Sequence, residues 1–305
     1  MTLVITTCTN SKRGDVPDAL RMRSLPLGRS SDVGAEWARR LRQAERVPVR
    51  NLYIGRGFQS AAKAATALDA RLLIVSAGLG LVDSQTPAPP YACTVLAGVS
   101  DSVGTRVSEA ISSSQWWKIL QAISPFAEQL GSVVNEDSGP ILASLSDAYL
   151  EMVAEDLLAL EPEKLARLRL FTRAPMAHVP TALRPFVMPY DDRLEGPDSG
   201  CAGPRSNFAA RALAHFAQAI LVEKDGRTAA QHQCAVITQL ADWRWPEKVE
   251  RRRLSDVEIM ELLEQHWDAA GGATGRLLSI LRHDLKVSCE QRRCKVLAQL
   301  VRDRR

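Results

Sequence analysis

Residues 71–91 read RLLIVSAGLGLVDSQTPAPPY, and this stretch decides how the chain is expected to fold. It opens with the apolar, β-branched run LLIVSA, which is typical of a strand buried on both faces of a sheet. Gly78 and Gly80 follow directly, and a glycine backbone can approach a ligand closely because it carries no side chain. Asp83 and a stiff, proline-rich loop ending at Tyr91 complete the stretch. Open α/β sheets bind their ligands at strand ends of this kind.

The same residues would also suit a tight turn after a strand, with an aspartate in the turn and a packing tyrosine. Two other strand-like runs favour a ligand site instead, because each is followed by a short polar or glycine-rich loop. The runs are residues 3–8 (LVITTC) and 50–54 (RNLYI), and their loops are Thr9-Asn10-Ser11-Lys12-Arg13 and Gly55-Arg56-Gly57-Phe58. Helical patterns at residues 35–46 and 59–68 separate the three runs. This β-α-β-α-β order predicts parallel strands with all three loops along one edge of the sheet.

The composition is that of an ordinary globular protein. The chain has 305 residues, 46% hydrophobic and 24% charged, which is enough for two domains. No apolar run reaches the roughly 18 residues of a membrane helix. The N-terminus also lacks the basic, apolar and small-residue sections of a signal peptide. We therefore expect a cytoplasmic protein with no membrane partner. The six cysteines form no C-x-x-C pair, so reduced thiols are expected, with no metal site and no cofactor.

The positive charge is concentrated toward the end of the chain. Residues 226–305 carry 15 Lys and Arg against 11 Asp and Glu, whereas residues 1–225 carry 24 of each. Such asymmetry is compatible with a polyanion bound along one face, although basic surfaces also occur in proteins that bind none. The composition changes after Asp225-Gly226. We therefore expect an α/β domain over residues 1–225 and a basic helical module over residues 226–305.

Three helices are predicted in the basic module. Ser255-Asp256-Val257-Glu258 is a capping box that opens a helix over residues 256–267. Helical patterns follow at residues 274–285 and 289–301, and the last is basic on one side, with Arg292 and Arg293. Three short helices with a cationic final helix are the outline of a helix-turn-helix or winged-helix DNA-binding module. Any small helical bundle would look similar.

The second half of the α/β domain offers further polar loops. Residues 168–172 (LRLFT) read as another core strand, and His178 beyond it is expected to be structural. Asp191 and Asp192 follow the run FVMPY. Pro204 suits the first turn of a helix that runs through residues 209–222. Arg205, Ser206 and Asn207 would then lie at the N-terminus of this helix, where free backbone amides favour an anion. Capping chemistry alone explains these residues equally well.

Four short motifs carry a family likeness. C-T-N-S-K, L-Y-x-G-x-x-F and V-S-A-G-L-G-L-V-D, with P-Y downstream, resemble the pattern C-(S/T)-x-x-K, Y-x-S-x-x-F, S-A-x-x-G-L-(V/L)-x-x-D and P-Y of a group of bacterial domains. Those domains resemble the uracil-DNA-glycosylase-like fold. The group includes antiphage DNA glycosylases and, more distantly, the peroxide stress-resistance protein that binds DNA. The likeness covers mainly residues 1–95, and the chain departs from it at Gly55-Arg56-Gly57 and in the spacing of Asp83.

The resemblance implies a three-layer α/β sandwich around a mostly parallel sheet, with a helical, winged-helix-like module after it. It also implies hydrolysis of the N-glycosidic bond of a modified base in double-stranded phage DNA, such as glucosylated hydroxymethylcytosine, leaving an abasic site in antiphage defence. Such chemistry needs a flipped-out nucleotide, a carboxylate, and donors for the departing base.

The resemblance assigns roles to three sets of residues. Asp83 is the first choice for the catalytic carboxylate, Asp191 or Asp192 competes with it, and Asn10 assists. The base would be contacted by Ser11, Ser76, Gly78 and Gly80 and stacked on Tyr91 or Phe58. The DNA phosphates would be held by Lys12, Arg13, Arg56, Arg205, Asn207, Arg292 and Arg293.

Two other classes of function fit the same sequence. A non-catalytic DNA-binding or regulatory protein would explain the basic helices without any reaction. A nucleoside hydrolase or deoxyribosyltransferase would use the same loops on free nucleosides and leave the basic module idle.

Overall fold

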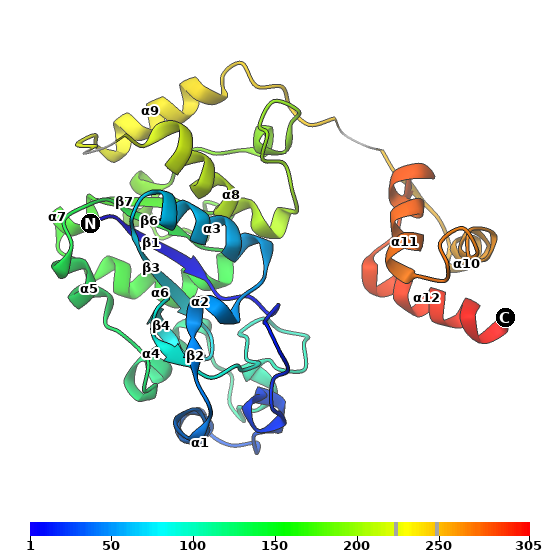
Figure 1. Ribbon diagram of the computed structural model, residues 1–305, viewed down its shortest axis with the longest axis horizontal. Helices are drawn as coiled ribbons and strands as arrows, with labels where there is room; N and C mark the ends of the chain where they lie inside the picture. Colours follow the sequence, from blue (N-terminus) through cyan, green and yellow to red (C-terminus); the bar gives the residue numbers. More distant parts are fainter. Residues whose placement is uncertain (223–224, 248–249) are drawn as a thin grey trace. The chain divides into compact units, whose positions relative to one another are not determined.

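The computed structural model describes residues 1–222, 225–247 and 250–305 (Figure 1). The chain forms two compact units, Met1–Trp245 and Pro246–Arg305. The division lies after Trp245 and not at the composition change after Asp225, because helix α9 (Ala229–Leu240) packs against η4 (Thr181–Phe186) and buries its apolar side chains in the first unit's core.

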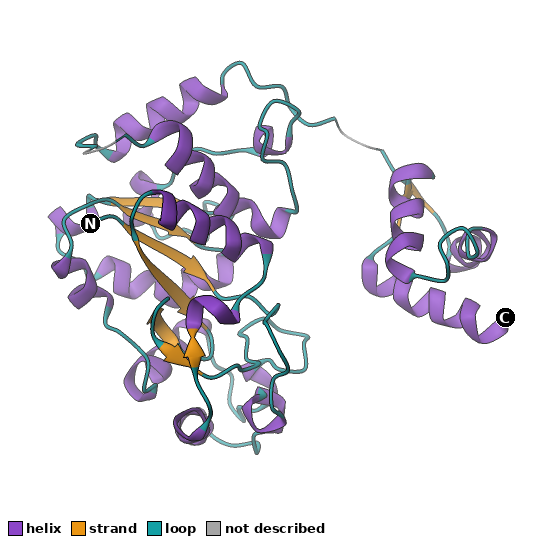
Figure 2. Cartoon of the chain, in the orientation of Figure 1, coloured by secondary structure: helices purple, strands orange, loops and turns teal. Residues whose placement is uncertain are grey.

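A five-stranded sheet forms the centre of the first unit (Figure 2). Its strand order is β4-β3-β1-β6-β7. The strands are β1 (Leu3–Thr7), β3 (Arg71–Ser76), β4 (Gly80–Asp83), β6 (Ile141–Ser144) and β7 (Leu168–Phe171). All neighbours pair in parallel except β4, which runs antiparallel to β3. The expected α/β fold with a mostly parallel sheet is confirmed.

Helices cover both faces of this sheet, an arrangement compatible with a three-layer sandwich. On one face α3 (Arg56–Ala67) packs with α8 (Phe208–His215) over β1 and β6. Small buried side chains, Ala61, Ala64 and Ala65, give α3 the flat surface that this close packing needs. The opposite face carries α1 (Ser30–Gln43), α4 (Ser113–Ile123), α5 (Leu130–Glu136) and α6 (Asp147–Leu158).

The prediction of a strand at residues 50–54 is wrong. Val49–Leu52 is a short helix, α2, and Tyr53 forms an isolated bridge with Lys12. Val49 and Leu52 lie three residues apart, so one helical turn buries both, which a five-residue apolar run does not reveal. The preceding residues form β2 (Val47–Pro48), which pairs with β5 (Pro87–Ala88).

The second unit has its own apolar core and the three expected helices in order. They are α10 (Asp256–Gln265), α11 (Thr274–Ser279), continued by η8 (Ile280–Asp284), and α12 (Gln291–Arg304). The capping box of Ser255 and Glu258 is present. Strands β8 (Arg252–Arg253) and β9 (Val287–Ser288) pair in parallel, so this ladder is not the hairpin of a wing.

Across residues 1–222, 225–247 and 250–305, no helix is both long enough and apolar enough to cross a membrane.

Candidate functional site

The carboxyl ends of β1 and β6 form a crevice in the first unit. The chain leaves β1 toward β3 and leaves β6 toward β7 on the other side, so the two connections diverge. Doubly wound sheets bind their ligands at such a switch point. A hollow of about 500 Å³ lies there, within the range of about 300–1,000 Å³ typical of small-molecule sites. Its polar lining comprises Thr6, Thr7, Cys8, Thr9, Ser144, Ser146, Asp147, Tyr149, Ser206 and Asn207.

Asp147 supplies a carboxylate to this hollow. It is the first residue of α6, three residues after the end of β6, and its side chain is 50% exposed. His178 Nδ1 lies 2.9 Å from Asp147 Oδ2, which fixes the carboxylate's orientation. The sequence pattern singles out neither Asp147 nor His178 for chemistry. An aspartate that follows a parallel strand closely is the one signal that could point to Asp147.

Tyr149 supplies a hydroxyl on the same wall. Its Oη lies 3.0 Å from Cys8 Sγ, and both side chains are buried. Burial raises the pKa of Tyr149 well above its ordinary value. The phenol therefore stays protonated near neutral pH and keeps a proton to donate.

The loops after β1 and before α3 meet at the hollow, as expected. A Cβ on Gly55 would lie 2.7 Å from Thr9 Oγ1, and one on Gly57 would lie 3.1 Å from Asn207 Oδ1. Glycine is needed at position 55 because a Cβ there would press on the Thr9 side chain, whereas a Cβ on Gly57 would require only a small shift of the Asn207 side chain. The approach brings Asn207, at the start of α8, to the edge of the hollow.

Cationic side chains lie beside a second hollow, which shares Asn207 with the hollow at the switch point. Arg56, Lys63 and Asn207 line this second hollow of about 350 Å³, and Arg56 and Lys63 are exposed. Arg205 is exposed one turn before α8, 3.4 Å from Asp192. Of the three arginines of the first unit expected to hold phosphates, Arg56 and Arg205 thus lie near the hollow at the switch point, whereas Arg13 does not line it.

Asp83 is not part of this site. β4 turns back along β3, so Asp83 pairs with Leu73, about 10 Å short of the strand end at Ser76. Its carboxylate forms an ion pair of 2.8 Å with Arg71 at the amino end of β3. β4 is also the edge strand, and β3 separates it from β1. The expectation that Asp83 lies with Asn10 and Arg56 is therefore wrong.

The turn between β3 and β4 serves packing instead of ligand binding. Trp37 Nε1 donates to the Gly78 carbonyl at 2.7 Å, and Trp116 Nε1 donates to that of Ala77 at 2.8 Å. Ser76 Oγ accepts the amides of Gly78 and Leu79 at 3.2 Å and 2.9 Å. Gly80 has φ +85°, which allows the reversal. The base contacts expected from Ser76, Gly78 and Gly80 are therefore wrong.

Tyr91 and Phe58 are not free to stack on a base. Tyr91 is fully buried, and its hydroxyl bonds to Ser76 and, at 2.7 Å, to Tyr53. Phe58 is 2% exposed and packs on the Tyr53 ring with centroids 5.1 Å apart. Phe58 contributes to the wall of the hollow, but both rings are almost fully covered by protein, which disfavours the stacking role expected for them.

Asp191 and Asp192 are paired with arginines and do not line the hollow. Asp191 accepts from Arg193 at 2.8 Å. Burial acts to raise the pKa of Asp191, but the hydrogen bonds from Arg193 outweigh it and hold that pKa below its ordinary value. Asp192 lies 2.6 Å from Arg173. These contacts leave Asp147 as the better carboxylate.

The remaining expected residues do not line this hollow. Asn10, Ser11 and Arg13 are exposed in the loop after β1, and Asn10 and Lys12 line a third hollow of about 320 Å³. In the second unit Arg292 is exposed, whereas Arg293 bonds to Asp256 at 2.7 Å. Arg293 is therefore engaged within its own unit.

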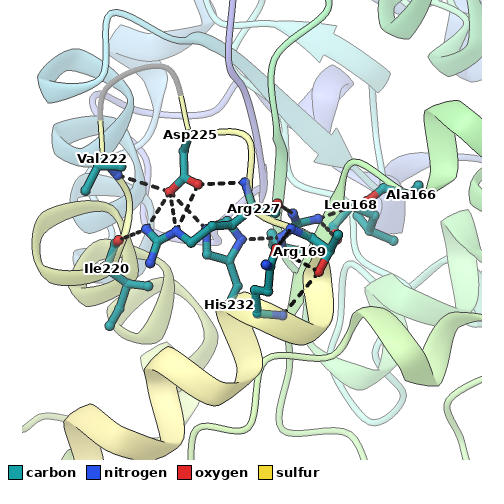
Figure 3. A network of polar contacts seen from close by, with 10 residues as sticks. Ala166, Leu168, Arg169, Ile220, Val222, Asp225, Arg227 and His232 are labelled. Carbon is teal, nitrogen blue, oxygen red and sulfur yellow. Dashed lines mark hydrogen bonds and ion pairs between the residues drawn. The ribbon is translucent and has the colours of Figure 1, made fainter.

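A larger hollow of about 920 Å³ lies at the amino ends of the strands. Figure 3 shows that polar groups beside it, those of Arg169, Asp225, Arg227 and His232, bond to one another. Because ligand sites of open α/β sheets lie at the carboxyl ends, the hollow at the switch point is the better candidate.

In the described part of the chain no group of three or more His, Cys, Asp and Glu side chains is placed to hold a metal ion. Comparison of the chain with protein-family models, with curated proteins and with solved structures finds no match.

Proposed function

We propose that the protein is a DNA N-glycosylase that hydrolyses the bond between a modified base and its deoxyribose. The observation that carries the proposal is the hollow at the ends of β1 and β6, where Asp147 is oriented by His178. The motif resemblance in residues 1–95 supports the same chemistry and, with it, a role against phage DNA.

The reaction divides among the residues around this hollow. An extruded nucleotide would enter it, at a cost of a few kcal/mol of lost stacking. Asp147 would stabilise the positive sugar of the transition state and position a water molecule for attack. The Tyr149 hydroxyl and the Asn207 amide would donate hydrogen bonds to the negative charge that grows on the departing base.

The charges outside the hollow support DNA as the substrate. Arg56 and Lys63 line the adjoining hollow, and Arg205 is exposed nearby. Side chains of this kind hold the phosphates on either side of an extruded nucleotide. The basic second unit, with the exposed Arg292, adds binding to DNA regardless of sequence. A bulky base such as glucosylated hydroxymethylcytosine suits a hollow of about 500 Å³.

Three substrates test the proposal with the full-length protein. They are plain duplex DNA, duplex DNA with glucosylated hydroxymethylcytosine, and the corresponding free nucleosides. We expect alkali-labile abasic sites in the modified duplex alone. Base release from nucleosides but not from DNA would favour a nucleoside hydrolase, and salt-sensitive binding with no released base from any modified DNA would leave a DNA-binding protein.

A further inference from the structure

Lys12 places its amine in an unusual environment beside the site. Its Nζ lies 4.3 Å from the centroid of the Tyr91 ring and 5.5 Å from that of Tyr53. It donates a hydrogen bond of 3.0 Å to the carbonyl of Thr9, which itself lines the hollow at the switch point. Lys12 also lines the third hollow, of about 320 Å³. The side chain therefore lines one hollow and is hydrogen-bonded to a residue that lines the other.

No carboxylate neutralises this amine within the described residues. Lys12 forms no ion pair there, and Asp101, which lines the same hollow, accepts the Arg23 amide at 3.2 Å. Burial lowers the pKa of Lys12, and the weaker effects of Cys8, Cys93 and Asp101 oppose it. A larger share of the amine is neutral near pH 7 than for an exposed lysine. Desolvated lysines of this kind act as nucleophiles toward carbonyl carbon.

We propose that Lys12 attacks the aldehyde of an opened deoxyribose, so that the protein is also an abasic-site lyase. The inference rests on the proposed function only for the source of the aldehyde, since removal of a base leaves an abasic sugar that opens to one. The third hollow has room for one sugar with its phosphate, and Asn10, Arg21 and Thr94 on its wall offer hydrogen-bond partners.

The reaction balances without any added reagent. The neutral Nζ adds to C1′, a water molecule leaves, and the imine nitrogen takes a proton from solvent to give a protonated imine. A carboxylate of the hollow, Asp15 or Asp101, takes a proton from C2′, and the bond from C3′ to the phosphate oxygen breaks as the 3′ phosphate leaves. Water then hydrolyses the imine and frees the lysine.

Borohydride trapping on a preformed abasic duplex tests this step, because it needs no base release by the protein. We expect a reduced covalent adduct with the wild type and cleavage 3′ to the abasic site. The adducted peptide should contain Lys12. Lys12→Gln should lose adduct formation at least 50-fold, whereas Lys118→Gln, which alters an exposed lysine on α4 that lines none of these hollows, should retain it.

Three results would overturn the inference. They are the absence of any adduct with the wild type, an adduct mapped to another lysine, and an adduct that persists in Lys12→Gln. Peptide mapping uses the wild-type protein, so the result does not depend on the folding of a variant. Trapping of free deoxyribose 5-phosphate without trapping of abasic DNA would also refute the assignment to DNA. Failure of base release, by contrast, would leave these outcomes unchanged.

Discussion

Asp225 is the centre of a buried ionic network that should control the stability of the first unit. Its side chain is 2% exposed and accepts hydrogen bonds from His232 Nε2 at 3.0 Å and from Arg227 Nε at 3.0 Å (Figure 3). Arg169 Nε donates to His232 Nδ1 at 2.7 Å. The four residues tie β7, the segment after helix α8 and the start of α9 together. Asp225→Asn keeps the shape and removes the charge.

The expected loss follows from the burial of this pair. Breaking a buried ion pair by removing one partner costs about 3–5 kcal/mol. Arg227 is 33% exposed and can regain water, so we expect the lower end, about 3 kcal/mol. For a unit of this size that loss lowers the melting temperature by about 6–12 °C.

Urea unfolding and calorimetry of the full chain measure this effect. Asp198→Asn is the matched control, because its partner Arg244 is 73% exposed and such pairs contribute at most about 1 kcal/mol. The transition of the second unit should not move in either variant. If Asp225→Asn cost no more than Asp198→Asn, the network would not stabilise the fold and the reasoning would be refuted.

Three further predictions follow from the structure. Burial lowers the pKa of His232, and Arg169 donates to its Nδ1, so the folded state holds His232 neutral. The unfolding free energy should therefore be highest above a pH of about 6.5 and should fall as the pH drops below it, because the unfolded state then takes up the proton. An unfolding free energy that stays constant from pH 7 to pH 5 would contradict this. Gly55→Ala, whose Cβ would press on Thr9, should cost about 1–3 kcal/mol and reduce base release, whereas Gly275→Ala, with open space, should not; equal behaviour of the two would argue against the close approach. Arg56→Gln should weaken DNA binding evenly across sequences and should reduce by about one the slope of the logarithm of the binding constant against the logarithm of the salt concentration. An unchanged slope would exclude a phosphate contact.

The sequence predicts the parts of the fold that depend on local pattern. The runs at residues 3–8 and 71–76 form β1 and β3, and the helices around residues 35–46 and 59–68 are present. The capping box at Ser255 opens α10. In each case an apolar period or a capping pair within about ten residues carries the whole signal.

The parts that sequence pattern misses depend on distant partners. G-L-G-L-V-D suits a ligand loop as well as a tight reversal, and the choice is made by Trp37 and Trp116, which bond to the turn from far along the chain. β6 has four residues, ILAS, too few to show a period. The signal that Asp147 follows a parallel strand therefore cannot be recognised until β6 is known.

The most direct test of the account compares two carboxylates in one assay. Single-turnover base release from modified duplex DNA is measured for wild type, Asp147→Asn and Asp83→Asn. If the nucleotide enters the hollow at the ends of β1 and β6, Asp147→Asn should slow release by about 100-fold or more, and Asp83→Asn should stay near the wild-type rate. A slow Asp83→Asn with a normal Asp147→Asn would contradict the site proposed here.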